Sequence, residues 1–183
     1  MTLRAAGVAQ NLGVTSQVGT PGTGTTAVEY GNGYQHTTVL TIAGVLPNIP
    51  GGASLGLGLK IYTLPAGVQS YWVSYMSVGI TQTTGHINAN TPNVGLGTVI
   101  ASGVISVLSG TATFQDIITG SNAANCTGTA TVSQAAPTGG APFIRNAAAA
   151  KDVFFNAAAA WAASGDPAAI VAGTVVLRWD TLA

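Results

Sequence analysis

The feature that most restricts the fold of this chain is a series of short runs rich in β-branched and aromatic residues, separated by clusters of Gly, Pro and Asn. The clearest runs are residues 34–45, 57–64, 68–80 and 173–179. Strands of this length bounded by turn residues are typical of β-sandwiches and barrels. We therefore predict an all-β fold, a jelly-roll-like β-sandwich of about eight strands.

The first part of the chain has a different pattern. Residues 1–26 contain several glycines and Pro21, and they show no sustained helical or strand period. This composition predicts an extended N-terminal arm over residues 1–26, followed by a β-sandwich domain over residues 27–183. A chain of 183 residues suits one such domain with an arm.

Two weaker patterns lead to further assignments. Four segments open with Gly-Thr and are predicted as short strands: 97–100, 110–114, 128–132 and 173–177. Residues 83–96 are rich in Gly, Asn and Pro and are predicted as the longest loop of the β region. Loops of this length are more often functional surfaces than simple connections.

The Ala-rich segment 146–163 fits either of two structures. Val153, Ala157 and Trp161 have helical spacing, and alanine favours helices. The same segment also alternates as a strand, because Val153, Phe155 and Ala157 would share one face. We favour a strand from Asp152 to Ala158 and leave the helix as the alternative.

The scarcity of charge limits the function. Five basic and five acidic residues make up only 5% of the chain, where an ordinary domain has about 25%. Binding to nucleic acid by neutralising phosphates is excluded, since there is no basic patch. A surface with so little charge favours association, so we expect copies of this chain or a larger assembly to cover much of it.

The sequence also argues against a membrane span and a disulfide. No stretch approaches the roughly 18 to 20 apolar residues that a spanning helix needs, and the N-terminus does not resemble a secretory signal. The single cysteine, Cys126, permits no internal disulfide and is predicted to be a small buried hydrophobic residue.

Few side chains could carry out catalysis. The candidates are His36, His86, Glu29, Asp116, Asp152, Asp166, Asp180 and Cys126. No two carboxylates share a short motif, and the histidines are far apart with no third ligand nearby, which disfavours zinc. A carboxylate pair from distant segments stays geometrically possible. We predict that the chain is not an enzyme and has no catalytic, metal or cofactor site.

An aromatic cluster offers a possible binding surface. Tyr71, Trp72 and Tyr75 lie in one predicted strand, and they could stack against sugars. The alternative is that at least one row of these side chains belongs to the core or to a subunit interface. The sequence leaves open whether this cluster, or the loop 83–96, binds a ligand.

The C-terminal segments resemble a known class of proteins. These segments are Lys151–Ala158, Trp161, Gly165–Asp166 and Gly173–Asp180. A hydrophobic strand ending in Asn-Ala, then a Trp, then a final Gly-Thr strand ending in Trp resembles the C-terminal part of the head decoration or cement proteins of tailed bacteriophages.

The resemblance implies a structural virion protein with a jelly-roll or related fold that trimerises on the outside of the capsid. The expected partners are other copies of the chain, as a homotrimer, and the major capsid protein, with no nucleic acid and no membrane. The protein would be made in the host cytoplasm and lie on the outer surface of the virion. The alternative is a fibre or host-surface module that binds carbohydrate.

Overall fold

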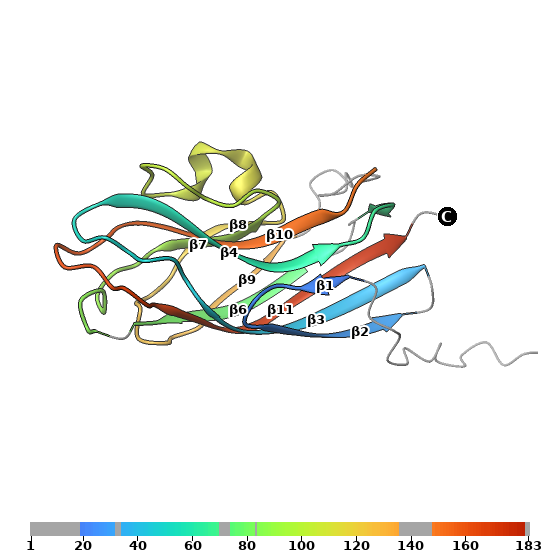
Figure 1. Ribbon diagram of the computed structural model, residues 1–183, viewed down its shortest axis with the longest axis horizontal. Helices are drawn as coiled ribbons and strands as arrows, with labels where there is room; N and C mark the ends of the chain where they lie inside the picture. The colour runs from blue at the N-terminus through green and yellow to red at the C-terminus, as the bar shows by residue number, and fades with distance from the viewer. Residues whose placement is uncertain (1–18, 32–33, 70–73, 83, 136–147, 182–183) are drawn as a thin grey trace, which may run out of the picture.

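The structure is a computed structural model that describes residues 19–31, 34–69, 74–82, 84–135 and 148–181. In this part of the chain, eleven strands pair antiparallel in two sheets packed face to face (Figure 1). The five-stranded sheet has the order β1 (Thr20–Pro21), β4 (Ser54–Leu64), β10 (Lys151–Ala160), β7 (Asn93–Gly97) and β8 (Ile118–Asn122). The six-stranded sheet has the order β2 (Thr25–Gly31), β3 (Gln35–Val45), β11 (Ile170–Thr181), β6 (Ser74–Thr81) and β9 (Thr131–Ala135), and β5 (Val68–Gln69) pairs with β11.

The strand order is that of a jelly roll. If β3, β4 and β6 to β11 are counted from 1 to 8 in chain order, the two sheets have the orders 1-8-3-6 and 2-7-4-5. Strand 1 therefore lies beside 8, 2 beside 7, 3 beside 6 and 4 beside 5, as in one long antiparallel hairpin rolled into a sandwich. This confirms the predicted jelly-roll-like β-sandwich, with β1, β2 and β5 as additional strands.

The core lies between the two sheets and follows the period-two alternation of the strands. On β3, Leu40 and Ile42 are buried while Thr41 is exposed. The largest fully buried side chains include Trp179, Tyr62 and Phe155. Burial of each large apolar side chain contributes about 1.5 to 3 kcal/mol, so the alternation keeps the two sheets together.

The Ala-rich segment is a strand, as favoured from the sequence. Within β10, Val153, Phe155 and Ala157 point into the core between the sheets. Asn156 and Ala158 are also buried, although they lie on the opposite face. Both faces of this strand are covered, which explains why it lacks a clear polar side.

Two of the four Gly-Thr segments were assigned wrongly. Residues 97–100 leave β7 after Gly97, and residues 110–114 form parts of two short 3₁₀ helices, η1 (Leu108–Gly110) and η2 (Ala112–Phe114). Their apolar side chains do not alternate toward the main core; Phe114 packs in a separate small cluster. The other two segments do contribute to strands, β9 and β11.

Other boundaries also differ from the predictions. The predicted loop 83–96 is too long, since residues 93–96 belong to β7, where Val94 and Leu96 are buried in the core. The predicted strand 68–80 comprises β5 and β6, separated by residues outside the described part.

The last residues of the predicted arm belong to the sandwich. Thr20 and Pro21 pair with β4, and Thr25 and Thr26 pair with β3. The strands therefore begin before residue 27, whereas residues 1–18 lie outside the described residues. Within the described part, no helix is long and apolar enough to cross a membrane.

Candidate interaction surface

The connection between β7 and β8, residues 98–117, lies over the outer face of the five-stranded sheet (Figure 1). We call it the 98–117 segment. It contains η1 and η2. Its beginning and end are joined by a hydrogen bond, in which the amide of Val99 donates to the carbonyl of Thr113 at 3.1 Å. The amide of Gly56 on β4 donates to the carbonyl of Gly103 at 3.0 Å. The segment is thus bonded both to itself and to the sheet.

Glycines on the strands beneath make room for this segment. A Cβ atom at Gly56 would collide with the side chain of Ile105, and one at Gly58 would collide with Ile100. A Cβ atom at Gly97 would collide with the backbone of Thr113 and Phe114. Glycine in a strand often marks a close approach of other chain. The Leu-Gly alternation of residues 55–58 is the sequence signal for this covering, and it was not among the predicted features.

A single buried amide fixes the backbone of the segment. The Oδ1 of Asn156 on β10 accepts from the amide of Ala101 at 2.8 Å. Its Nδ2 donates to the carbonyls of Val99 at 2.9 Å and Phe114 at 2.8 Å. The side chain is fully buried, so these bonds are shielded from water, and losing one would leave buried polar groups without partners.

The segment also has a hydrophobic core of its own. Ala101, Leu108 and Phe114 pack against Ala158 of β10, with Ile105 half-buried beside them. The amide of Leu108 donates to Oδ1 of Asn93 at 3.0 Å. The irregular backbone is therefore held by packing and by specific side-chain bonds.

A carboxylate ties down the start of the segment. Asp116 accepts from the amide of Thr98 at 2.7 Å and from its hydroxyl at 2.6 Å. Burial raises the pKa of Asp116, and the two bonds from Thr98 partly oppose that effect. Asp116 was a candidate catalytic acid in the sequence, and the structure places it in a supporting contact.

The outward side of the segment is uncharged and exposes four large apolar side chains among Ser, Thr and Gly residues. Val104 is 85% exposed, and Val99, Ile100 and Val107 are each more than 40% exposed. Beside Val107, a shallow depression of about 280 Å³ is lined by uncharged side chains, including Asn90, Ser106 and Asn122. A fixed backbone that presents several apolar side chains to solvent is suited to docking on another protein, because little further ordering is needed on binding.

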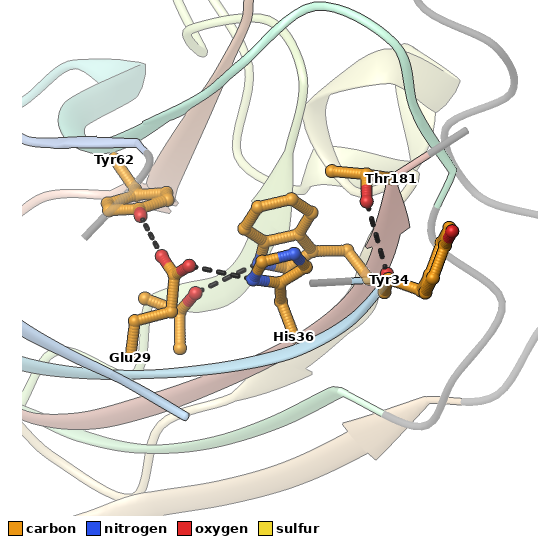
Figure 2. Close-up of polar contacts among 7 residues, drawn as sticks. Glu29, Tyr34, His36, Tyr62 and Thr181 are labelled. Carbon is orange, nitrogen blue, oxygen red and sulfur yellow. Dashed lines mark hydrogen bonds and ion pairs between the residues drawn. The ribbon is translucent and has the colours of Figure 1, made fainter. Parts of the chain in front are cut away.

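The structure brings two of the titratable candidates, Glu29 and His36, together with Tyr62 between the sheets (Figure 2). Glu29 on β2 lies 2.8 Å from Nδ1 of His36 on β3, and it accepts from the hydroxyl of Tyr62 on β4 at 3.0 Å. His36 stacks on Trp179, with ring centroids 4.1 Å apart. Burial, then the charge of Glu29, raises the pKa of Tyr62. All four side chains are buried, so this cluster acts as a polar connection within the core.

The remaining candidates occupy separate structural positions. At the loop end of the sandwich, buried Asp166 accepts from the amide and hydroxyl of Thr84, while Nδ1 of His86 lies 2.8 Å from the carbonyl oxygen of Gly165. Asp152 accepts from the hydroxyl of Thr63 and lies 3.6 Å from the amine of Lys60. Asp180 belongs to β11, where it is the register partner of Gln35 on β3.

The predictions for Cys126 and for the aromatic cluster have different outcomes. Cys126 is fully buried, as predicted, and burial raises the pKa of its thiol to about 12. Tyr71 and Trp72 lie outside the described residues, whereas Tyr75 is half-buried on β6. Across the described ranges, no group of three or more His, Cys, Asp or Glu side chains is placed to hold a metal ion.

Comparison with known proteins assigns no family. No protein-family model matches the chain, and no curated protein sequence matches it. A similar solved structure is that of an arabinose-bound glycoside hydrolase 51 α-L-arabinofuranosidase, with a TM-score of 0.40 and 14% sequence identity. The match covers 90% of this chain and 24% of that enzyme chain, so this chain spans about a quarter of the enzyme's length. At this level of similarity, the match carries neither a family nor an activity to this chain.

Proposed function

We propose that the protein is a non-enzymatic structural virion protein, a decoration or cement protein that binds the outer surface of a phage capsid and stabilises it. The observation that carries this proposal is the 98–117 segment, a fixed protrusion that exposes Val99, Ile100, Val104 and Val107. In this proposal the segment is a docking site for the major capsid protein. The part of the predicted arm that precedes β1, residues 1–19, is the second contact with the shell or with a neighbour.

The small number of charges supports docking on a protein surface. Two of the five acidic residues, Glu29 and Asp166, are buried inside the sandwich, so the surface has even less charge than the composition indicates. Burying charge at an interface is costly unless the charge is paired. An apolar protrusion with uncharged surroundings avoids that cost.

The fold agrees with this proposal without deciding it. Jelly rolls occur in viral capsid proteins and also in lectins, and a fold does not specify a function. The resemblance of the C-terminal strands to phage decoration proteins adds the expected arrangement, a homotrimer on the outer surface of the virion. Such a trimer uses the same interface three times through cyclic symmetry.

Binding to capsid shells assembled without this protein tests the proposal. We expect the wild-type protein to saturate such shells at a simple ratio to the major capsid protein. Val104→Asp should weaken binding at least tenfold, because it places a charge at the centre of the apolar protrusion. Ala163→Asp is the matched control, since it adds the same charge at an exposed position in a loop at one end of the sandwich.

Two results would contradict the proposal. Wild-type protein that fails to bind shells would remove the capsid function altogether. Equal binding by Val104→Asp and Ala163→Asp would show that the 98–117 segment is not the docking site. Deleting residues 1–20 is a separate test of the arm, and we expect that deletion to reduce binding to shells.

A further inference from the structure

The outer face of the six-stranded sheet has a regular and almost uncharged surface. The side chains that alternate with the core on β2, β3, β11 and β6 form rows across the strands, because the register aligns them. The rows are Val28, Val39, Val176, Tyr75; Thr26, Thr41, Thr174, Ser77; Ala43, Ala172, Gly79; and Val45, Ile170, Thr81. Two rows with bulky side chains therefore lie on either side of two rows of small or hydroxyl side chains.

This face is exposed in the isolated chain. Val45 is 57% exposed and its register partner Ile170 is 37% exposed, while Val28 at the opposite corner is 42% exposed. The helical turns of the 98–117 segment lie on the other side of the sandwich (Figure 1). Single exposed apolar residues are ordinary, but here Val45 and Ile170 are neighbours and Val28 begins a row with Val39 and Val176, and apolar rows of this kind can mark an interaction surface.

We propose that two copies of this chain pack face to face through the outer surface of the six-stranded sheet. The row that begins at Val28 in one copy would lie over the row that begins at Ala43 in the other, and the two threonine rows would meet at the centre. Two sheets packed in this way stay within about 30° of parallel alignment and interdigitate their side chains. This contact is separate from docking on a capsid and does not require it.

The charges on this face permit contact with a second copy. Within the described strands, the charged outward residues of this face are Arg178 and Asp180, both near the end of β11. They have opposite signs, so the face has no net charge and two identical faces do not repel each other.

The size of the face is sufficient for a specific contact. Four strands spaced about 4.8 Å apart give a width of about 19 Å. The eleven residues of β3, at about 3.3 Å each, give a length of about 36 Å. A footprint of about 600 Å² per copy buries about 1,200 Å² in total, which exceeds the about 1,000 Å² expected of a biological interface.

The proposed symmetry has a direct consequence for the number of copies. A face that meets itself requires a twofold axis, so the pair has an even number of chains. A cyclic trimer needs a different interface, and in that case the face-to-face contact would join one trimer to another. The pairing is therefore separable in measurement from both trimer formation and shell binding.

Sedimentation equilibrium of the purified full chain, without shells, tests the proposal. We expect the wild-type protein to associate into a dimer or an even multiple such as a hexamer. Thr41→Lys places like charges opposite each other at the centre of the face and should weaken this association at least tenfold. Thr119→Lys on β8 is the matched control, because Thr119 is an exposed strand residue of the other sheet, and it should associate as the wild type does.

A cross-linking measurement keeps the test decisive if Thr41→Lys folds poorly. Thr174→Cys, at the centre of the face, should form a disulfide between copies under mild oxidation, whereas Thr119→Cys should not. Cys126 does not interfere, since it is buried. A wild-type protein that stays monomeric or only trimeric, or equal cross-linking of the two cysteine variants, would overturn the proposal. Shell binding by Thr41→Lys, measured separately, shows whether capsid docking survives loss of the pairing.

Discussion

The outer faces of the two sheets differ in how much of their surface the chain itself covers. On the five-stranded sheet, the chain covers its own face with the 98–117 segment, which contributes a small core around Leu108 and Phe114. On the six-stranded sheet, the corresponding face remains open and exposes Val28, Val45 and Ile170. An antiparallel sheet commonly has one solvated, polar face, and neither face of this protein fits that pattern.

The difference shows how a sheet face with few charges can be stabilised. The covered face has glycines at Gly56 and Gly58 where the segment approaches, so its strands depend on that segment to bury their backbone. The open face has rows of bulky side chains and rows of small ones, and its strands do not depend on such a segment. We infer that the first face is completed within one chain, whereas the second is completed by another copy.

The largest expected effect concerns the core that both faces share. Trp179→Ala should lower the free energy of unfolding by about 3 to 5 kcal/mol, because it leaves a large cavity. It also removes the ring that stacks on His36 and the indole N–H that donates to the hydroxyl of Thr38 at 2.9 Å. Denaturant unfolding measures this change. A loss within about 0.5 kcal/mol would place Trp179 outside the core and contradict the fold.

An intermediate effect distinguishes the covered face from the open one. Asn156→Ala should cost about 2 to 4 kcal/mol, because it leaves one buried amide and two buried carbonyls of the 98–117 segment without their partner. Asn48→Ala, at an exposed position, is the control and should change stability by less than about 0.5 kcal/mol. Hydrogen exchange should rise in residues 98–117 while β3 and β11 stay protected. Equal costs for the two variants would mean that this amide does not hold the segment.

The smallest effect is the response of the covered face to pH. The pKa of Asp116 is raised above its ordinary value of 3.8, so the folded protein binds this proton more tightly than the unfolded chain. The contribution of Asp116 to stability is therefore greatest in acid and declines as pH rises from 3.8 through the raised pKa. Asp116→Asn should remove this decline from the stability profile. Identical pH profiles for the variant and the wild type would show that burial of this carboxyl has no energetic effect.

Much of the fold could be predicted from local patterns. The alternation in residues 34–45 and 173–179 marked β3 and β11, and the strand interpretation of Asp152–Ala158 was right. The strands β3 and β11 were predictable because each has one face in the core, and period-two burial leaves a direct record in the sequence. Both faces of β10 are covered, but the alternating Val153, Phe155 and Ala157 still indicated the strand. Residues 97–100 and 110–114 also carry β-prone residues, but their apolar side chains pack on the outside of a sheet, so the same pattern was misleading.

The candidate site was far less accessible to prediction. Asn156 was noted only as part of a C-terminal resemblance, and its amide bonds join residues more than 40 positions away. Glu29, His36 and Tyr62 had no shared motif, since three different strands bring them together. Contacts of this kind depend on how the strands are ordered in space, and local propensity contains no information about that order.

By itself, the sequence determined that this chain folds as an all-β domain with few charges and a core of alternating apolar residues. The physical reason is that strand formation and burial depend on side chains two positions apart, which any short segment displays. Only the tertiary structure decided which outer face is covered by the chain itself and which is left open. That outcome depends on long-range pairing, which places residues 98–117 over β4 and β10 and leaves nothing described over β3 and β11.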